Sequence, residues 1–137
     1  MTQAISTLDV LLASMKPKLQ AGVYVFASVP FDADLRGVEA IATFREREGL
    51  TMIVEESEAS KAGLTPLFRA AWITLTVHSD LNAVGLTAAF ARALGDANIS
   101  CNVVAAAFHD HIFVPVDDAG RALAALEALQ KRASARE

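Results

Sequence analysis

The stretch from Trp72 to Val116 constrains the fold most strongly, because its hydrophobic period changes at identifiable points. Residues 72–78 (WITLTVH) alternate, with Ile73, Leu75 and Val77 on one side, which predicts a strand with two unlike faces. Residues 79–82 then offer side chains that can cap a helix. The helix predicted after them, VGLTAAFARAL, repeats a large apolar residue at every fourth position: Leu86, Phe90 and Leu94.

Two further strands and a helix complete this unit. ISCNVVAAAF begins a strand at Ile99, residues 109–111 (HDH) are expected to form the turn, and residues 112–116 (IFVPV) return as the next strand. Asp117 or Asp118 suits the N-terminus of a final helix, where a carboxylate caps the backbone and complements the helix dipole. The pattern therefore predicts strand, helix, strand, strand and helix in that order.

The N-terminal half has similar elements in a different order. A helix over residues 5–15 is expected to end before Pro17. The elements expected after it are a strand over 23–29, a hairpin of 42–46 and 50–56 turning at Gly49, and a short helix over 57–63 that ends at Gly63.

Length and charge exclude several classes of protein. With 137 residues, the chain forms one domain or two small units that share a core. The net charge is −4 and the basic residues are scattered, so we expect no nucleic-acid partner. We expect no membrane partner either, because no run of about 18 uncharged apolar residues occurs. Asp9 interrupts the N-terminal apolar stretch and Cys101 is the single cysteine, so we expect a cytoplasmic protein without a signal peptide or an internal disulfide.

The segment HSDLNAVGLTAAFARALGDANISCNVV resembles the ACT domain, a small-molecule-binding regulatory module with the order βαββαβ. The matching positions are Asp80, Asn82, Gly85, Leu94, Ala97 and Ile99. With FREREGLTMIV, SDLNAVGLTAA and ISCNVVAAAFHDHIFVPV, roughly residues 5–130 resemble small bacterial proteins that consist of two ACT-like halves. The resemblance implies an α+β fold with ferredoxin-like antiparallel sheets and helices on one face.

We expect the two halves to be residues 1–66 and 67–137, interlocked in one compact unit. The C-terminal half departs from the ACT pattern, because it ends on a helix where the usual module ends on a fourth strand. We therefore expect the strand at residues 23–29 to complete the C-terminal sheet.

The candidate site is the loop before the second-half helix. Its expected ligand-binding residues are Ser79, Asp80, Leu81, Asn82, Val84, Gly85, Leu86 and Asn102. Free N–H groups at a helix N-terminus suit a carboxylate, and Asp80 would receive an ammonium group. The plainer interpretations are that the polar residues only cap the helix, that Gly85 permits a close strand–helix contact, and that Asn102 is hydrogen-bonded within the core.

His109-Asp110-His111 raises the question of a metal site. Catalytic zinc requires three protein ligands, and the third is sought among His78, Asp110 and Cys101. A hairpin whose histidines bond to backbone or to the N-terminal half is the alternative that we favour. The consecutive His78, Ser79 and Asp80 are too close in sequence to form a nucleophile–base–orienter line, and an apolar strand gives Cys101 no electropositive setting. We expect no catalytic residues, no cofactor and no metal.

The sequence thus predicts a non-enzymatic regulatory protein that binds a small effector, an amino acid by preference, and that forms a homodimer. Two alternatives remain open. One is a ligand-free protein–protein interaction module of ACT fold, and the other is a metal-dependent enzyme that uses the HDH segment.

Overall fold

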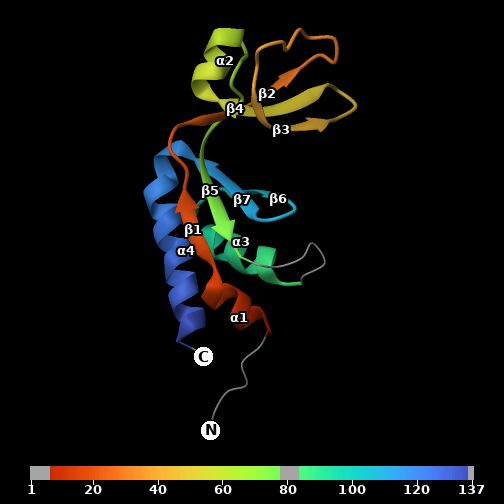
Figure 1. Cartoon of the computed structure of the whole chain (residues 1–137). Helices are drawn as coiled ribbons and strands as arrows, with labels where there is room; N and C mark the ends of the chain where they lie inside the picture. Colours follow the sequence, from red (N-terminus) through yellow and green to blue (C-terminus); the bar gives the residue numbers. More distant parts are fainter. Residues whose placement is uncertain (1–6, 78–83, 136–137) are drawn as a thin grey trace.

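The computed structural model describes residues 7–77 and 84–135. Helices and strands alternate irregularly along the chain (Figure 1). In order, the elements are α1 (Thr7–Ser14), β1 (Lys16–Leu19), β2 (Tyr24–Val29), β3 (Ala40–Arg45), β4 (Leu50–Glu55), α2 (Glu56–Ala62), β5 (Phe68–Thr76), α3 (Leu86–Asp96), β6 (Asn102–Ala105), β7 (Asp110–Pro115), a 3-10 turn η1 (Val116–Asp118) and α4 (Ala119–Ser134).

Within the described residues, seven strands form one antiparallel sheet that is centred on β5. Its order is β3-β4-β2-β5-β7-β6, and β1 also pairs with β5. One edge of β5 pairs with β7 from Ala70 to Leu75. The other edge is shared, because β2 pairs with its first residues and β1 pairs with Ile73–Thr76. The nine-residue β5 therefore joins the two halves of the chain (Figure 1).

The strand β1 was not predicted from the sequence. Residues 23–29 do join β5 as expected, through Tyr24, Val25 and Phe26. However, the strand beside the C-terminal end of β5 is β1, whose Pro17 had been interpreted only as the end of a helix. Proline lacks a donor but is tolerated on an edge strand, and among the described strands β1 pairs only with β5.

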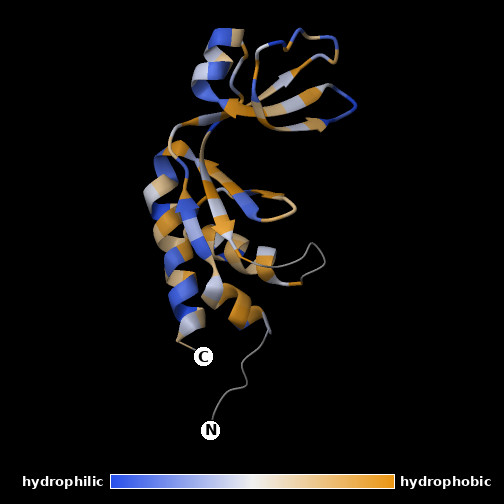
Figure 2. Ribbon diagram, in the orientation of Figure 1, coloured by the Kyte–Doolittle hydropathy of each residue, from blue (hydrophilic) through white to orange (hydrophobic). Residues whose placement is uncertain are grey.

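The four α-helices of the described residues cover the same face of the sheet. Helices α1, α3 and α4 enclose the larger core, which contains Leu12, Met15, Ile73, Leu75, Phe90, Leu94, Ile112 and Leu126. The short α2 covers β2 and β4 around Val25 and Val54. Figure 2 shows that α1 is largely hydrophobic, as a helix held in this core should be, whereas α4 alternates between hydrophilic and hydrophobic residues. None of the described helices is long and apolar enough to cross a membrane.

Most element predictions are confirmed, with shifts at their ends. The buried stripe Leu86, Phe90 and Leu94 is confirmed, and so is the αL residue Gly63 after α2. The strand expected from Trp72 begins at Phe68. The turn expected at residues 109–111 was wrong: the chain reverses at residues 106–109, and β7 begins at Asp110. Pairing of Ala105 with Asp110 extends the hairpin beyond what the apolar pattern indicates.

Candidate functional site

Among the described residues, no side chain caps the start of helix α3. Its N-cap is Gly85, with φ +96°, so this glycine lies just before the helix and not in the first turn as predicted. The carbonyl of Gly85 accepts the first helical bond from Ala89. The residue before it, Val84, is 89% exposed, whereas Leu86 is buried in the core. Among the described residues, the backbone N–H groups at the start of α3 thus have no side-chain acceptor, and Val84 before them is largely exposed.

Gly85 also makes a close contact with helix α1. A Cβ atom at this position would lie 3.3 Å from Cδ2 of Leu8. The close neighbour is therefore a helix from the N-terminal half, and not the strand that the sequence interpretation considered. The positive φ and the Leu8 side chain both account for a glycine here within the fold itself.

The structure separates two of the predicted site regions. Ser79, Asp80, Leu81 and Asn82 lie outside the described residues, as does His78. Leu86 faces the core beneath the helices, but Asn102 pairs with Phe113 and lies on the opposite, helix-free face of the sheet. There the side-chain amide of Asn102 donates to the backbone carbonyl of Phe113 (3.3 Å) and to Oγ of Ser100 (3.5 Å).

His111 belongs to a polar network on the helix-free face. The indole Nε1 of Trp72 donates to Nδ1 of His111 at 3.0 Å, and Oγ1 of Thr74 lies 3.2 Å from the same nitrogen. Gln20 in turn donates to the Thr74 hydroxyl at 3.0 Å. The partners of His111 are therefore side chains of β5, not the backbone. Since an indole N–H can only donate, Nδ1 accepts, and the neutral ring carries its proton on Nε2.

The environment keeps His111 neutral. Burial lowers the pKa of His111, and the neighbouring His109 lowers it further, while Asp110 partly opposes the shift. The rings of His109 and His111 lie 6.4 Å apart and nearly perpendicular. Within the described part of the chain, no three His, Cys, Asp or Glu side chains are grouped to hold a metal ion. Burial also raises the pKa of the Cys101 thiol, which disfavours the reactive thiolate.

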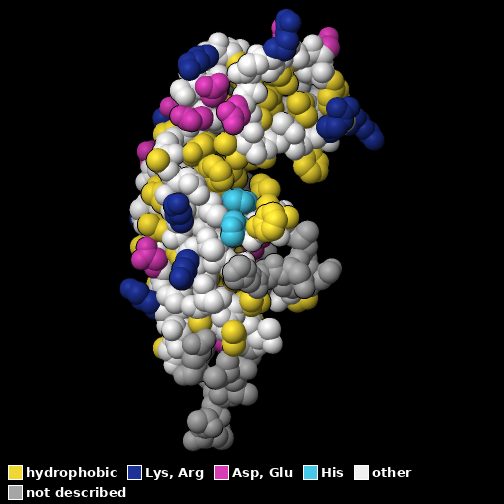
Figure 3. Space-filling view, in the orientation of Figure 1, with side chains coloured by type: hydrophobic (Ala, Val, Ile, Leu, Met, Phe, Trp, Pro, Cys, Tyr) yellow, Lys and Arg dark blue, Asp and Glu magenta, His cyan; other side chains and the backbone are white. Residues whose placement is uncertain are grey.

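A hollow lies beside this network on the helix-free face. Its volume is about 360 Å³, and the described residues lining it are Ile41, Ala42, Trp72, Val104, Ala106, His111 and Phe113. Residues of β3 and β6, the two ends of the strand order, both line it, so the sheet curls around the hollow. Figure 3 shows the molecule indented on this side, with histidine side chains on one wall. This site was not identified from the sequence. The signal that could have found it was the presence of two side chains with ring nitrogens, Trp72 and His111, on one face of paired strands.

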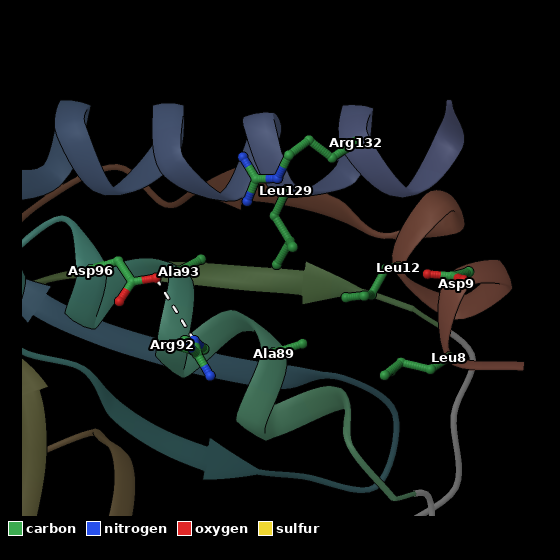
Figure 4. Close-up of a pocket in the computed structure, with 9 residues that line it drawn as sticks. All are labelled: Leu8, Asp9, Leu12, Ala89, Arg92, Ala93, Asp96, Leu129 and Arg132. Carbon is green, nitrogen blue, oxygen red and sulfur yellow. Dashed lines mark ion pairs between the residues drawn. The ribbon is translucent and has the colours of Figure 1, made fainter. Parts of the chain in front are cut away.

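A second concavity lies between helices α1, α3 and α4 (Figure 4). Its volume is about 310 Å³. The apolar part is contributed by Leu8, Leu12, Ala89, Ala93 and Leu129, and the charged part by Asp9, Arg92, Asp96 and Arg132. Arg92 and Asp96 form an ion pair at 3.9 Å, and both are highly exposed. We call this concavity the helix groove.

Solved structures of other proteins share this fold. A Vibrio cholerae protein, described as of unknown function and as a possible transport protein, is 50% identical with a TM-score of 0.83, over 90% of this chain and 96% of that chain. The ligand-free regulatory subunit of aspartate kinase from Thermus thermophilus is 12% identical with a TM-score of 0.65, over 82% and 95%. Aspartokinase III from E. coli, in complex with aspartate and ADP, is 10% identical with a TM-score of 0.58, over 84% and 32%.

Family models identify the class of protein. Two models described as ACT domain match residues 3–71 and 68–128. The chain therefore belongs to the ACT domain family, with two ACT-like halves. Among curated proteins, no sequence matches it.

Proposed function

We propose that this chain is a regulatory ACT-domain protein that binds an amino acid at the start of α3. The observation that carries the proposal is the first turn of α3, where Gly85 precedes Leu86 and no side chain of the described residues occupies the N–H groups. These donors and the positive end of the helix dipole suit the carboxylate of an amino acid. The exposed Val84 leaves this end of the helix accessible.

Asp80 is assigned to the ammonium group, and Ser79, Leu81 and Asn82 to the same site. This assignment rests on their position in the sequence directly before Val84. Asn102 is left out of the proposed site, because it lies on the face of the sheet opposite to α3. A carboxylate beside the helix N-terminus would give the site both charges that a zwitterion requires.

Membership of the ACT family and a fold shared with a regulatory subunit of aspartate kinase support the regulatory part of the proposal. We divide the chain at residues 66 and 67 into an N-terminal half and a ligand-binding C-terminal half. The contact between Leu8 and Gly85 connects the proposed site to the N-terminal half. An amino acid bound there would thus act on the placement of α1 and, through it, on the association of two copies.

The test compares two carboxylate-to-amide variants. Asp80→Asn removes the charge that is assigned to the ammonium group, whereas Asp32→Asn removes a charge in the N-terminal half, remote in sequence from the site. Calorimetric titration with the amino acid that stabilises the wild type should show at least a tenfold weaker affinity for Asp80→Asn and an unchanged affinity for Asp32→Asn. Equal affinities in all three proteins would reject the assignment of Asp80.

The second candidate is an interaction module that works by association alone. The helix groove favours it, because an apolar floor is bordered by two arginines and two aspartates at the surface. A second copy that is turned over by a twofold axis could place its arginines against these aspartates, so the groove is complementary in charge to itself. We therefore propose this groove as the contact in the homodimer.

Sedimentation equilibrium of the double variant Arg92→Glu/Arg132→Glu tests the contact. Both changes convert a groove cation to an anion, so the dimer should dissociate at concentrations where the wild type is paired. Lys131→Glu on α4 is the matched control, since this residue is exposed but does not line the groove. A double variant that associates as tightly as the wild type would remove the groove from the interface.

A further inference from the structure

The hollow on the helix-free face has an aromatic wall. The rings of Trp72 and Phe113 lie nearly parallel, with centroids 6.0 Å apart and an interplanar angle of 21°. Tyr24 meets the edge of Trp72 at 5.2 Å and 90°. Phe113 is 1% exposed, while Trp72 is only half-buried and keeps part of its ring at the hollow. Such a wall offers a flat surface on which another ring can stack.

The Trp72 ring is held in place by hydrogen bonds. Its Nε1 bonds to His111, and the Thr74 hydroxyl and the Gln20 amide extend the network. Thr74, which joins Gln20 to His111, is buried, and the other members of the network are half-buried around it. A site whose stacking ring is already fixed loses little conformational entropy when a ligand binds.

The hollow offers a ligand an uncharged hydrogen-bond donor, the ring N–H of His111. Among the described residues that line it, Trp72 and His111 carry polar side-chain atoms. The N–H of Trp72 is used in its hydrogen bond to Nδ1 of His111. The remaining ring nitrogen, Nε2, carries the proton and can donate to a ligand. No Asp, Glu, Lys or Arg is among these described lining residues, so they offer a charged ligand no partner in return for the hydration that it would lose.

Size and surroundings fit a small ring system. An apolar cavity of about 150 Å³ can hold benzene, so a hollow of about 360 Å³ has room for a bicyclic molecule with a substituent. Two exposed aromatic residues stand near its borders. Phe44, 71% exposed, follows Ala42 on the same face of β3, and Phe108, 81% exposed, lies in the turn after Ala106.

We propose that this hollow binds an uncharged, planar aromatic molecule carrying a hydrogen-bond acceptor, at a site separate from that of the amino acid. The ring stacks on Trp72, and the acceptor, such as a carbonyl oxygen, bonds to Nε2 of His111. Because β3 belongs to the first half of the chain and β6 and β7 to the second, the ligand contacts both halves. Binding therefore holds the curl of the sheet in one position.

The 137-residue protein contains a built-in reporter, since Trp72 is its single tryptophan. In a ¹H–¹⁵N correlation spectrum, the one indole N–H signal is titrated with quinoline-3-carboxamide. A saturable shift of this signal is expected. Quinoline-3-carboxylate, the matched anion, and cyclohexanecarboxamide, which is not planar, should each bind at least tenfold more weakly.

Two substitutions narrow the hollow from opposite sides, Ala106→Phe at the hairpin and Ala42→Leu on β3. Each should weaken binding of quinoline-3-carboxamide at least tenfold, whereas Ala107→Phe, in the same turn but not lining the hollow, should leave it unchanged. If the spectrum shows that Ala106→Phe has lost its fold, Ala42→Leu decides. The proposal is overturned if the indole signal does not move, if the anion binds equally well, or if the folded narrowing variants keep full affinity.

Discussion

The indole nitrogen of Trp72 donates a hydrogen bond to Nδ1 of His111 across 3.0 Å, on the face of the sheet that no helix covers. Trp72 lies opposite Phe113 and His111 lies opposite Thr74, so the bond runs diagonally between β5 and β7. It fixes the tautomer of the histidine and the plane of the indole together. The same bond therefore joins the paired strands β5 and β7 and orients two side chains that line the hollow.

The pH dependence of stability should carry the signature of His111. Its pKa in the folded state is lowered from 6.5, so the unfolded chain binds this proton more readily. The free energy of unfolding should therefore fall as the pH decreases from about 6.5 towards the folded-state pKa. His111→Gln keeps an acceptor for Trp72 but does not titrate in this range, so its denaturant midpoints should vary less between pH 7 and pH 5.

The comparison with His111→Gln is needed because the neighbouring Asp110 changes the free energy of unfolding with pH in the opposite direction. Burial raises the pKa of Asp110 above 3.8, so its contribution to stability falls as the pH rises through the window above that value. Both proteins contain Asp110, and since His111 lowers the pKa of this carboxyl, the replacement of His111 by Gln should raise that pKa further. An unchanged pH profile in His111→Gln would show that protonation of His111 is not coupled to folding.

Gly85→Ala should destabilise the fold by about 1–3 kcal/mol. The positive φ of +96° is strained for alanine, and the new Cβ would lie 3.3 Å from Leu8. Gly95→Ala in the same helix is the control, because nothing lies within 4 Å of its Cβ position, and it should stabilise by about 0.4–1 kcal/mol. Denaturant unfolding measures both, and two changes of the same sign would contradict this role of Gly85.

Met15→Ala should destabilise the whole molecule by about 2–5 kcal/mol. Met15 connects α1 to β1, is 1% exposed, and belongs to the core that α3 and α4 enclose. Val10→Ala changes an exposed position of α1 and should alter stability by no more than about 0.5 kcal/mol. A small effect at Met15, equal to that at Val10, would mean that the N-terminal segment is not part of the C-terminal core.

Cys101 should react slowly with thiol reagents. It is half-buried, and burial raises the pKa of its thiol, so little thiolate is present at neutral pH. Because it is the single cysteine, the absorbance change with a disulfide reagent reports this residue alone. The rate in native buffer should be at least tenfold below that in denaturant, and equal rates would show an accessible, unperturbed thiol.

Local patterns predicted most of the fold because they record burial directly. The alternation through Ile73, Leu75 and Val77 and the stripe of Leu86, Phe90 and Leu94 both face the same core. The strand β1 could not be predicted, because its sequence KPKL contains two exposed lysines and a proline. It is a strand because β5 provides a free edge, and pairing with a distant segment leaves no periodic signal in a four-residue sequence.

The candidate site was less predictable for the same reason. The sequence predicted a helix here but placed Gly85 in its first turn instead of just before it, and the contact of Gly85 with Leu8 depends on how α1 is placed. The hollow is formed by β3 and β6, which are separated by about half the chain and are brought together by the curl of the sheet. Asn102 was grouped with the loop, yet the strand face that it occupies is set by pairing with β7.

The most direct test of amino-acid binding is a thermal-shift panel of the purified protein against the twenty amino acids. A ligand at a hundredfold excess over its dissociation constant stabilises the folded state by about 2.7 kcal/mol, which raises the unfolding midpoint by several degrees. We predict that one amino acid, or a chemically related pair, raises the midpoint and that Asp80→Asn reduces this stabilisation to about half or less. A flat response across all twenty would contradict the effector site and leave association through the helix groove as the function.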